Sequence, residues 1–249
     1  MRYASALGKN ITIGLVLWVA VWLIPNKSLA YYFPGWSHGA SGHYIALREA
    51  IDEEKPLIVY FHTDTCKWSK SLNSDYLATS KAYQFLNGIS RVEINPEKGA
   101  NEKSLSKKYG VKGFPSFFAY VPAFGSDAGI NIYPFRKDKN WSVDEFIDAI
   151  SKKLGNQYNR KGHSCLTKKK YHEAIRYFEM GIDYSPEDPY GYYGIGNAYH
   201  NLAHKEKETA LLKEAEGYYS KALAIDPNHE GSKEGLEKLQ KALEKLGKR

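Results

Sequence analysis

Two cysteines are the residues of this sequence best suited to covalent chemistry. Cys66 opens a Cys-Lys-Trp-Ser run that ends at Ser69 and follows the apolar stretch 57–61, which is typical of a buried strand. A thiolate attacks disulfides, and the positive charge of Lys67 favours the thiolate of Cys66. We expect Cys165, in a helical region, to fill the core. The alternative is a Cys66–Cys165 disulfide, which needs Cα atoms within about 7 Å.

The elements that must position Cys66 alternate between strands and helices. The pattern predicts strands over 57–62, 89–94, 116–121 and 130–135, and helices over 43–53, 101–109 and 142–154, with a further helix beginning near Cys66. The early alternation indicates parallel pairing, and the last two strands indicate an antiparallel edge. We therefore expect a mixed α/β sheet flanked by helices, preceded by an arm or linker over 31–42.

The apolar strand that runs into the Cys66 motif, followed about fifty residues later by Gly113-Phe114-Pro115, resembles the thioredoxin superfamily. The resemblance covers 43–154. It implies a thioredoxin-like fold and a cis Phe114–Pro115 bond that faces Cys66. It also implies that the Cys66 sulfur lies at a helix N-terminus, where the helix dipole favours the thiolate. In the family, the backbone before this proline pairs with an extended client segment.

Three residues around the thiol are the candidate substrate-binding residues. Phe114 differs from the small or β-branched residue that is common there in the family, so it is expected to narrow the groove. Trp68 offers an aromatic platform beside the thiol, or else is half buried against the domain. Lys67 adds a positive charge next to Cys66.

Two departures from the family pattern bear on turnover. Ser69 replaces the second cysteine, which in dithiol members attacks the mixed disulfide and releases the product. We expect the Ser69 hydroxyl to donate a hydrogen bond to the Cys66 sulfur, as in monothiol relatives that rely on an external thiol. Tyr60 replaces the buried acid that manages protons for the second cysteine. The catalytic residues predicted for this monothiol site are Cys66, Ser69 and Pro115, with inefficient general disulfide reduction.

Beyond residue 154 the sequence predicts helices alone, and large, small and aromatic residues recur at matching positions. The pairs are Tyr158 with Tyr192, Gly162 with Gly196, Ala174 with Ala215, Phe178 with Tyr219, Gly181 with Ala222 and Pro186 with Pro227. These residues resemble the tetratricopeptide pattern, whose period of 34 residues separates the first two pairs. The other four pairs are 41 residues apart, because the second copy carries seven extra residues near 204–211. We expect an all-α domain of helical hairpins, with two repeats over 155–228 and a capping helix and tail over 229–249.

The resemblance to tetratricopeptide repeats implies a concave face that binds a peptide or a partner helix. Its candidate residues are Tyr158, Tyr192, Tyr193 and Tyr199. With two repeats and a cap, the alternative is that most of these tyrosines belong to the core.

The first thirty residues are typical of an export signal. Arg2 and Lys9 carry positive charge, an apolar run covers 11–24, and Ser28-Leu29-Ala30 offers a cleavage site. A helix over 11–24 is about 21 Å long, shorter than the roughly 30 Å hydrocarbon layer, which favours a signal peptide over 1–30 against an uncleaved anchor. The remaining chain is then extracytoplasmic, in the periplasm or secreted, and contacts the membrane only through an uncleaved N-terminal segment.

The composition argues against several other function classes. The 249 residues are 43% hydrophobic and 25% charged, as in folded proteins of one or two domains. The net charge is +7, but basic and acidic residues are interleaved, so no nucleic-acid surface is predicted. Neither a Gly-rich phosphate loop nor a His/Cys cluster with metal spacing is present, so we expect no cofactor and no metal.

Two functions from different classes remain. The first is an exported thiol protein, in which Cys66 forms mixed disulfides with client proteins recruited by the repeats and an external low-molecular-weight or protein thiol completes the cycle. The second is a redox-inactive adaptor that binds proteins in a cell-envelope assembly.

Overall fold

A computed structural model describes residues 35–125, 129 and 131–247 of the chain. It divides into two units, 1–34 and Gly35–Arg249, of which the second is described below. The signal peptide expected over 1–30 lies outside the described residues. Among the described helices, none combines the length and the apolar character that a membrane crossing requires.

Four strands form one mixed sheet in the described part of the chain, in the order β1-β3-β2-β4. Their bounds are β1 (Ser37–His38), β2 (Leu57–Phe61), β3 (Ser90–Ile94) and β4 (Ser116–Tyr120). Strands β1 and β2 run parallel to β3, whereas β4 runs antiparallel to β2. The register aligns Val59 of β2 with Val92 on one side and with Phe118 on the other. The mixed α/β architecture expected from the sequence is confirmed.

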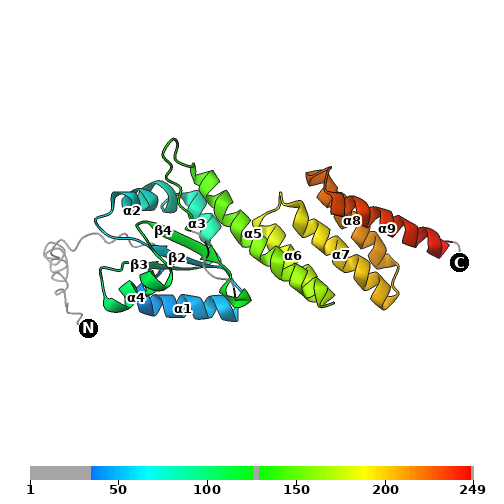
Figure 1. Ribbon diagram of the computed structural model, residues 1–249, viewed down its shortest axis with the longest axis horizontal. Helices are drawn as coiled ribbons and strands as arrows, with labels where there is room; N and C mark the ends of the chain where they lie inside the picture. Colours follow the sequence, from blue (N-terminus) through cyan, green and yellow to red (C-terminus); the bar gives the residue numbers. More distant parts are fainter. Residues whose placement is uncertain (1–34, 126–128, 130, 248–249) are drawn as a thin grey trace, which may run out of the picture. The chain divides into compact units, whose positions relative to one another are not determined.

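Helices cover both faces of this sheet (Figure 1). Those before the long helix α5 are α1 (Gly39–Asp52), α2 (Lys67–Ser71), the π-helix η1 (Leu72–Leu77), α3 (Ser80–Leu86), α4 (Ala100–Lys108) and the 3₁₀ turn η2 (Pro122–Phe124). Helices α1 and α4 contact each other and α1 contacts β2 and β3, while α5 (Val143–Thr167) contacts β4, η1 and α3. The central strand β2 is therefore buried along its whole length.

Alternation along β2 divides its side chains between two cores. Leu57, Val59 and Phe61 belong to the core that includes Ala46 and Ala50 of α1. The opposite face is aromatic, because the rings of Tyr60 and Phe117 lie 6.1 Å apart and that of Phe117 packs at 5.2 Å against Phe146 of α5. Burial of large apolar side chains on both faces is the main favourable term for such a sheet.

Two sequence expectations about this sheet were wrong. The second half of the expected arm or linker over 31–42 is regular structure, because Ser37 and His38 form β1 and helix α1 begins at Gly39. The strand expected over 130–135 is absent from the described residues of that range. Ile132 donates one backbone hydrogen bond to the Phe117 carbonyl, at 2.7 Å, but the Phe117 amide bonds to the Asn131 side-chain oxygen at 2.6 Å. The Asn131 side chain thus takes the place of a backbone acceptor, and the ladder stops.

Helix α5 runs for 25 residues through the boundary expected between Leu154 and Gly155. Its start is fixed by a capping box, in which the Ser142 hydroxyl accepts from the Glu145 amide and the Glu145 carboxylate accepts from the Ser142 amide. Gly155 lies inside this helix and does not end it. A Cβ at Gly155 would crowd Ser185, so the glycine permits close packing of the helices. The two domains therefore share a helix and are not joined by a linker.

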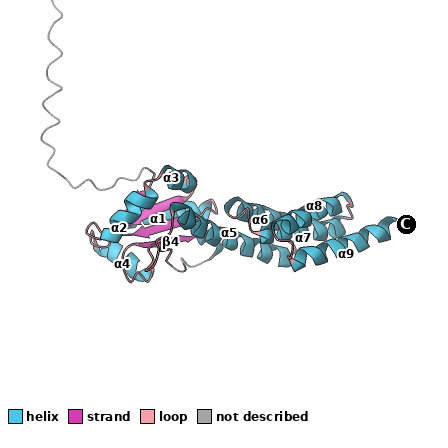
Figure 2. Cartoon of the chain, turned by 90° about the horizontal axis from the view of Figure 1, so that it is seen from above, coloured by secondary structure: helices cyan, strands magenta, loops and turns pink. Residues whose placement is uncertain are grey.

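In the described residues after α5, every regular element is a helix (Figure 2). They are α6 (Tyr171–Tyr184), α7 (Pro189–Glu206), α8 (Ala210–Ile225) and α9 (Glu230–Gly247). The repeat is also visible in the packing. A Cβ on Gly162 would lie 2.9 Å from the ring of Phe178, and a Cβ on Gly196 would lie 2.8 Å from the ring of Tyr219. Helix α9 covers the second hairpin, since Leu239 is fully buried in the same cluster as Tyr219.

Candidate functional site

Cys66 lies where β2 leads into α2. Its backbone has extended angles at the N-cap of α2, and its amide donates to the Thr63 carbonyl at 3.3 Å. The Sγ atom donates to the Phe114 carbonyl at 3.4 Å, and the Phe114–Pro115 bond is cis. The structure thus brings together Cys66, Phe114 and Pro115 as the sequence predicted. Cys66 is half buried, and both Cys66 and Cys165 are free thiols.

The other residues of the Cys66 motif face different surroundings. Ser69 is 1% exposed, and its hydroxyl has no hydrogen-bond partner among the described residues. The hydrogen bond expected from Ser69 to the Cys66 sulfur is therefore not formed. Trp68 is 44% exposed, and its ring packs against Phe135 with 4.9 Å between centroids. Lys67 is exposed, with its Nζ atom 6.0 Å from the centre of the Trp68 ring.

Tyr60 supplies no proton acceptor at the position of the family's buried acid. Its hydroxyl donates at 2.8 Å to Asn73 Oδ1 and lies 3.3 Å from the Ser69 carbonyl. Burial raises the pKa of Tyr60 well above its usual range, and the nearby Glu93 acts in the same direction. Tyr60 therefore stays protonated and anchors the start of η1, the π-helical segment that contains Asn73.

Beside Tyr60 lies a group that the sequence did not single out as a site. The His62 ring stacks on the Tyr60 ring at 5.0 Å, and His62 Nε2 lies 3.6 Å from Glu93 Oε2. The second Glu93 oxygen lies 2.8 Å from His38 Nδ1. Burial lowers the pKa of His62 despite this carboxylate. The parallel register of β1, β2 and β3 brings these groups together, because it pairs Glu93 with Tyr60 on one side and with His38 on the other.

Two hollows flank Phe114, which lines both of them. One has a volume of about 610 Å³, and its lining includes Tyr109, Lys112, Phe114, Pro115, Asn131 and Tyr133. The other has a volume of about 540 Å³, and its lining includes Pro96, Glu97, Lys98, Gly99, Lys103 and Phe114. Phe114, whose carbonyl accepts from the Cys66 thiol, therefore lies between the two hollows, and its effect on the width of a client groove stays a prediction. We call the two hollows together the Phe114 groove.

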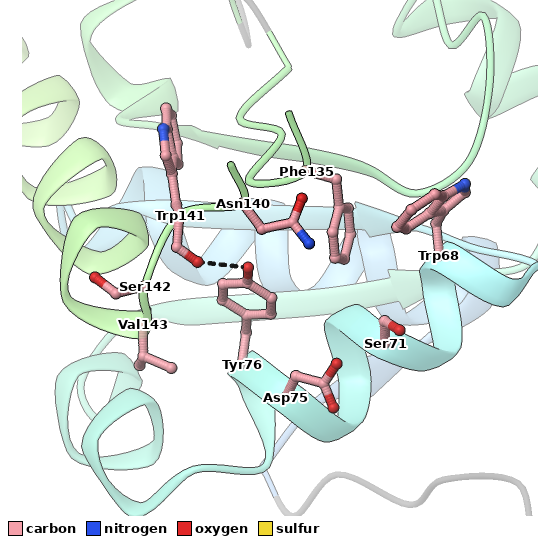
Figure 3. A pocket seen from close by; sticks show the side chains of 9 residues that line it. All are labelled: Trp68, Ser71, Asp75, Tyr76, Phe135, Asn140, Trp141, Ser142 and Val143. Carbon is pink, nitrogen blue, oxygen red and sulfur yellow. Dashed lines mark hydrogen bonds between the residues drawn. The ribbon is translucent and has the colours of Figure 1, made fainter. Parts of the chain in front are cut away.

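A third, smaller hollow of about 290 Å³ lies on the other side of the motif (Figure 3). Trp68, Phe135 and Tyr76 form a row along it, and the Tyr76 hydroxyl donates to the Trp141 carbonyl at 2.7 Å. Trp68 is thus one wall of a hollow, and its role as an aromatic platform beside Cys66 stays a prediction. Sequence reasoning did not identify Phe135 or Trp141 here, because both come from the segment that was expected to form a strand or its following loop.

The four repeat tyrosines do not form one exposed face. Tyr158 is 1% exposed, and its hydroxyl donates to the Glu54 carbonyl at 2.8 Å, so its expected role in partner binding is wrong. Tyr192, Tyr193 and Tyr199 are half buried. Tyr193 packs at 5.0 Å against His229, and Tyr199 stacks at 5.7 Å on Tyr218. The core alternative holds fully for Tyr158 and in part for the other three.

Cys165 is a core residue on α5, as expected. It is 5% exposed, and burial raises the pKa of its thiol. Its Sγ atom lies 3.9 Å from Glu173 Oε2 of α6. Across the described ranges, no three His, Cys, Asp or Glu side chains are arranged to hold a metal ion.

Comparison with known proteins gives matches to both parts of the chain. A family model of the tetratricopeptide repeat matches residues 158–188. Among curated proteins, the chain is similar to "Protein disulfide isomerase-like 2-2" of Oryza sativa subsp. japonica, with 27% identity over 203 residues, which are 78% of this chain and 49% of that protein. The chain spans about half the length of this curated relative.

Three solved structures are also similar. A thioredoxin from Thermus thermophilus has 20% identity and a TM-score of 0.35, and the match covers 47% of this chain and 85% of that one. "DsbH Oxidoreductase" has 19% identity and a TM-score of 0.34, with 50% of this chain and 93% of that one covered. The first tetratricopeptide domain of human RPAP3 has 24% identity and a TM-score of 0.21, with 36% of this chain and 93% of that one covered. The sheet order, the thiol at the start of α2 and the repeated helix packing agree with the two resemblances seen in the sequence. The chain therefore combines a thioredoxin-like domain with tetratricopeptide repeats.

Proposed function

We propose that this chain is an exported thiol–disulfide protein in which Cys66 forms mixed disulfides with client proteins. The observation that carries the proposal is the contact of the half-buried Cys66 Sγ with the carbonyl of Phe114 at 3.4 Å, because Phe114 lines both hollows of the Phe114 groove. A thiol there can meet an extended chain that lies in the groove. The curated relative is named as a disulfide isomerase, which supports chemistry of this class.

The reaction needs one thiol of this chain and one external thiol. The Cys66 thiolate attacks one sulfur of a client disulfide, a new S–S bond forms, and the other client sulfur leaves as a thiolate that takes a proton from water. An external low-molecular-weight or protein thiolate then attacks the client sulfur of the mixed disulfide. Cys66 leaves as a thiolate and the client carries the external group. Ser69 has no sulfur, so it cannot perform this second attack.

The contact between Cys66 and Phe114 couples the thiol to client binding. The Cys66 thiol is the hydrogen-bond donor to the Phe114 carbonyl, and a thiolate or disulfide sulfur has no proton to donate. Loss of the proton therefore frees this carbonyl to accept an amide N–H from the client backbone. Client pairing by strand addition and nucleophilic attack thus favour the same protonation state of Cys66.

The remaining parts of the chain fit recruitment and location. Tetratricopeptide repeats of other proteins present surfaces for protein partners, so we assign the second domain to client or partner binding. Export, by the signal peptide proposed over 1–30, delivers Cys66 to a compartment in which client disulfides persist.

A second function, that of a redox-inactive adaptor, is favoured by two observations in the site. The Ser69 hydroxyl does not reach the Cys66 sulfur, and Tyr60 is a protonated donor where dithiol members have a buried acid. In this alternative the thioredoxin-like domain binds proteins without forming covalent adducts.

Trapping of adducts separates the two functions. Acid quenching of cells, followed by non-reducing electrophoresis, should show Cys66-dependent mixed disulfides with the parent chain and none with Cys66→Ser. Ser69→Cys restores a resolving thiol and should raise disulfide-reductase activity over the parent by at least about tenfold, because release no longer waits for an external thiol.

Ser69→Ala is the matched control, since it changes the same buried position without adding sulfur. It should show no gain in reductase activity. Absence of adducts from the parent, together with no activity of Ser69→Cys, would overturn the thiol function and leave the adaptor.

A further inference from the structure

The Phe114 groove carries cations on both sides of Phe114, the residue whose carbonyl accepts from the Cys66 thiol. Lys112 lines the hollow of about 610 Å³, and Lys103 lines the hollow of about 540 Å³ on the other side of Phe114. Both lysines are exposed. Within the described ranges, neither forms an ion pair with a carboxylate. Each hollow thus offers an ammonium group whose charge is not neutralised.

The other charged residues near the groove leave it positive. Lys98 lines the second hollow together with Glu97, and its Nζ atom pairs with Asp64 at 2.6 Å. Lys67 is exposed directly after Cys66. Two carboxylates lie at the second hollow, Glu97 in its lining and Glu102 beside the lining residue Gly99. The lysines Lys103 and Lys112 of the two linings, with Lys67 next to Cys66, still outnumber them.

We propose that the Phe114 groove selects client segments that carry carboxylate side chains on both sides of the disulfide-bonded cysteine. This inference rests on the proposed function, because the client must approach Cys66 along the groove. A segment that crosses in front of Phe114 places its flanking side chains in the two hollows. Lys103 then faces the carboxylate on one side, and Lys112 faces the carboxylate on the other.

The chemistry of the attack makes this charge pattern useful. A disulfide flanked by carboxylates repels a thiolate, because both partners are negative. Lysines on both sides of the attacked bond offset this repulsion and attract the client over several ångströms before contact. Attraction between exposed charges is screened by salt, so the preference should weaken as ionic strength rises.

Three peptides of one sequence test the inference with the full chain. Each carries a single cysteine as a disulfide with an aromatic thiol whose release is followed by absorbance, and the residues flanking the cysteine are Glu, Gln or Lys. At low ionic strength the second-order rate of adduct formation should be highest for Glu and lowest for Lys, with about a tenfold range. At about 0.5 M salt the range should shrink to less than about threefold.

Charge-reversal variants assign the effect to the groove. The double variant Lys103→Glu with Lys112→Glu should reverse the order of the three peptides. The control Lys213→Glu with Lys233→Glu makes the same change in net charge on exposed residues of α8 and α9, and it should keep the parent order.

The outcomes separate this inference from the proposed function. Equal rates for the three peptides, or an order that survives in the groove variant, would overturn the charge preference while leaving Cys66 a working thiol. Equal loss of preference in the control variant would likewise show that only net charge matters. If no peptide forms an adduct with the parent, the proposed function fails and this inference fails with it.

Discussion

At the scale of single residues, this site differs from a dithiol site by one buried hydroxyl, that of Ser69. Ser69 lies three residues after Cys66 on α2 and is 1% exposed, without a hydrogen-bond partner in the described structure. An unpaired buried hydroxyl costs about 1 to 3 kcal/mol, so the position is not optimised for serine as a structural residue. A sulfur at this position would be buried at little cost, because a thiol is a weaker hydrogen-bonding group than a hydroxyl. The helix start is therefore compatible with two thiols but carries one.

Histidines in the thioredoxin-like domain predict how stability depends on pH. His43 is 5% exposed, and its Nε2 atom lies 2.7 Å from the Tyr109 hydroxyl. Burial, with a smaller contribution from Lys108, lowers the pKa of His43 from its ordinary value of 6.5. Below pH 6.5 the unfolded chain takes up the proton first, so the free energy of unfolding should fall as the pH falls.

His43→Gln removes the imidazole that takes up this proton in the unfolded chain. Urea unfolding at several pH values between about 5 and 7 should show a shallower loss of stability for this variant, by at most about 1.4 kcal/mol per pH unit. Part of the slope should remain, because the pKa values of His62 and His200 are also lowered by burial. The exposed His163 provides the control variant His163→Gln, and an equal change of slope in both variants would contradict the assignment.

At the scale of elements, the helices of the repeats approach one another over glycines. Phe178 of α6 is 1% exposed, and its ring lies against Gly162 of α5 and Gly194 of α7. The ring thus fills the space that side chains on both neighbouring helices would need. Gly196 of α7 has the same relation to Tyr219 of α8. Close packing of one aromatic ring between glycines defines the spacing of successive helices.

Gly194→Ala should therefore destabilise the chain in spite of the better helix propensity of alanine. The new Cβ would overlap the ring of Phe178, which has no free space to move into, and such overpacking costs about 1 to 3 kcal/mol. On α8, Gly217 is exposed with nothing within 4 Å of its Cβ position, so Gly217→Ala should stabilise by up to about 1 kcal/mol. Urea unfolding of both variants measures the difference, and effects of equal sign would contradict this packing argument.

At the scale of the whole unit from Gly35 onward, the turn after α1 ties the sheet domain to the first helical hairpin. Glu54 lies in this turn with φ of 52°. Its carbonyl accepts from Tyr158 at 2.8 Å, and its carboxylate accepts from the Tyr177 hydroxyl at 2.6 Å and pairs with Arg176 at 2.8 Å. The ring of Phe124 packs edge-on against both tyrosines. Together with the shared helix α5, these contacts couple the two domains mechanically.

This coupling predicts that residues 155–160 resist proteolysis in the parent chain, because they lie inside α5 and on this seam. Tyr158→Ala should lower the free energy of unfolding by about 3 to 5 kcal/mol and make 155–160 a site of early cleavage. Tyr158→Phe keeps the ring and loses one hydrogen bond, so it should cost about 1 kcal/mol and stay resistant. Early cleavage of the parent between 155 and 160 would show that the domains are joined by a linker.

Periodicity and local motifs in the sequence determined the elements, the sheet type, the place of Cys66 and the repeats. They succeed because the apolar run 57–61, and the spacing of Gly162, Gly196 and their aromatic partners, are local consequences of burial. The register of strands, the direction of the Ser69 hydroxyl, the burial of Tyr158 and the hollows beside Phe114 were decided only by tertiary structure. Each of these depends on which surfaces from distant parts of the chain meet. Strand β1 has two residues, too few to show a period in the sequence. The strand expected over 130–135 does not form in its described residues because the Asn131 side chain, and not a backbone carbonyl, accepts from the Phe117 amide.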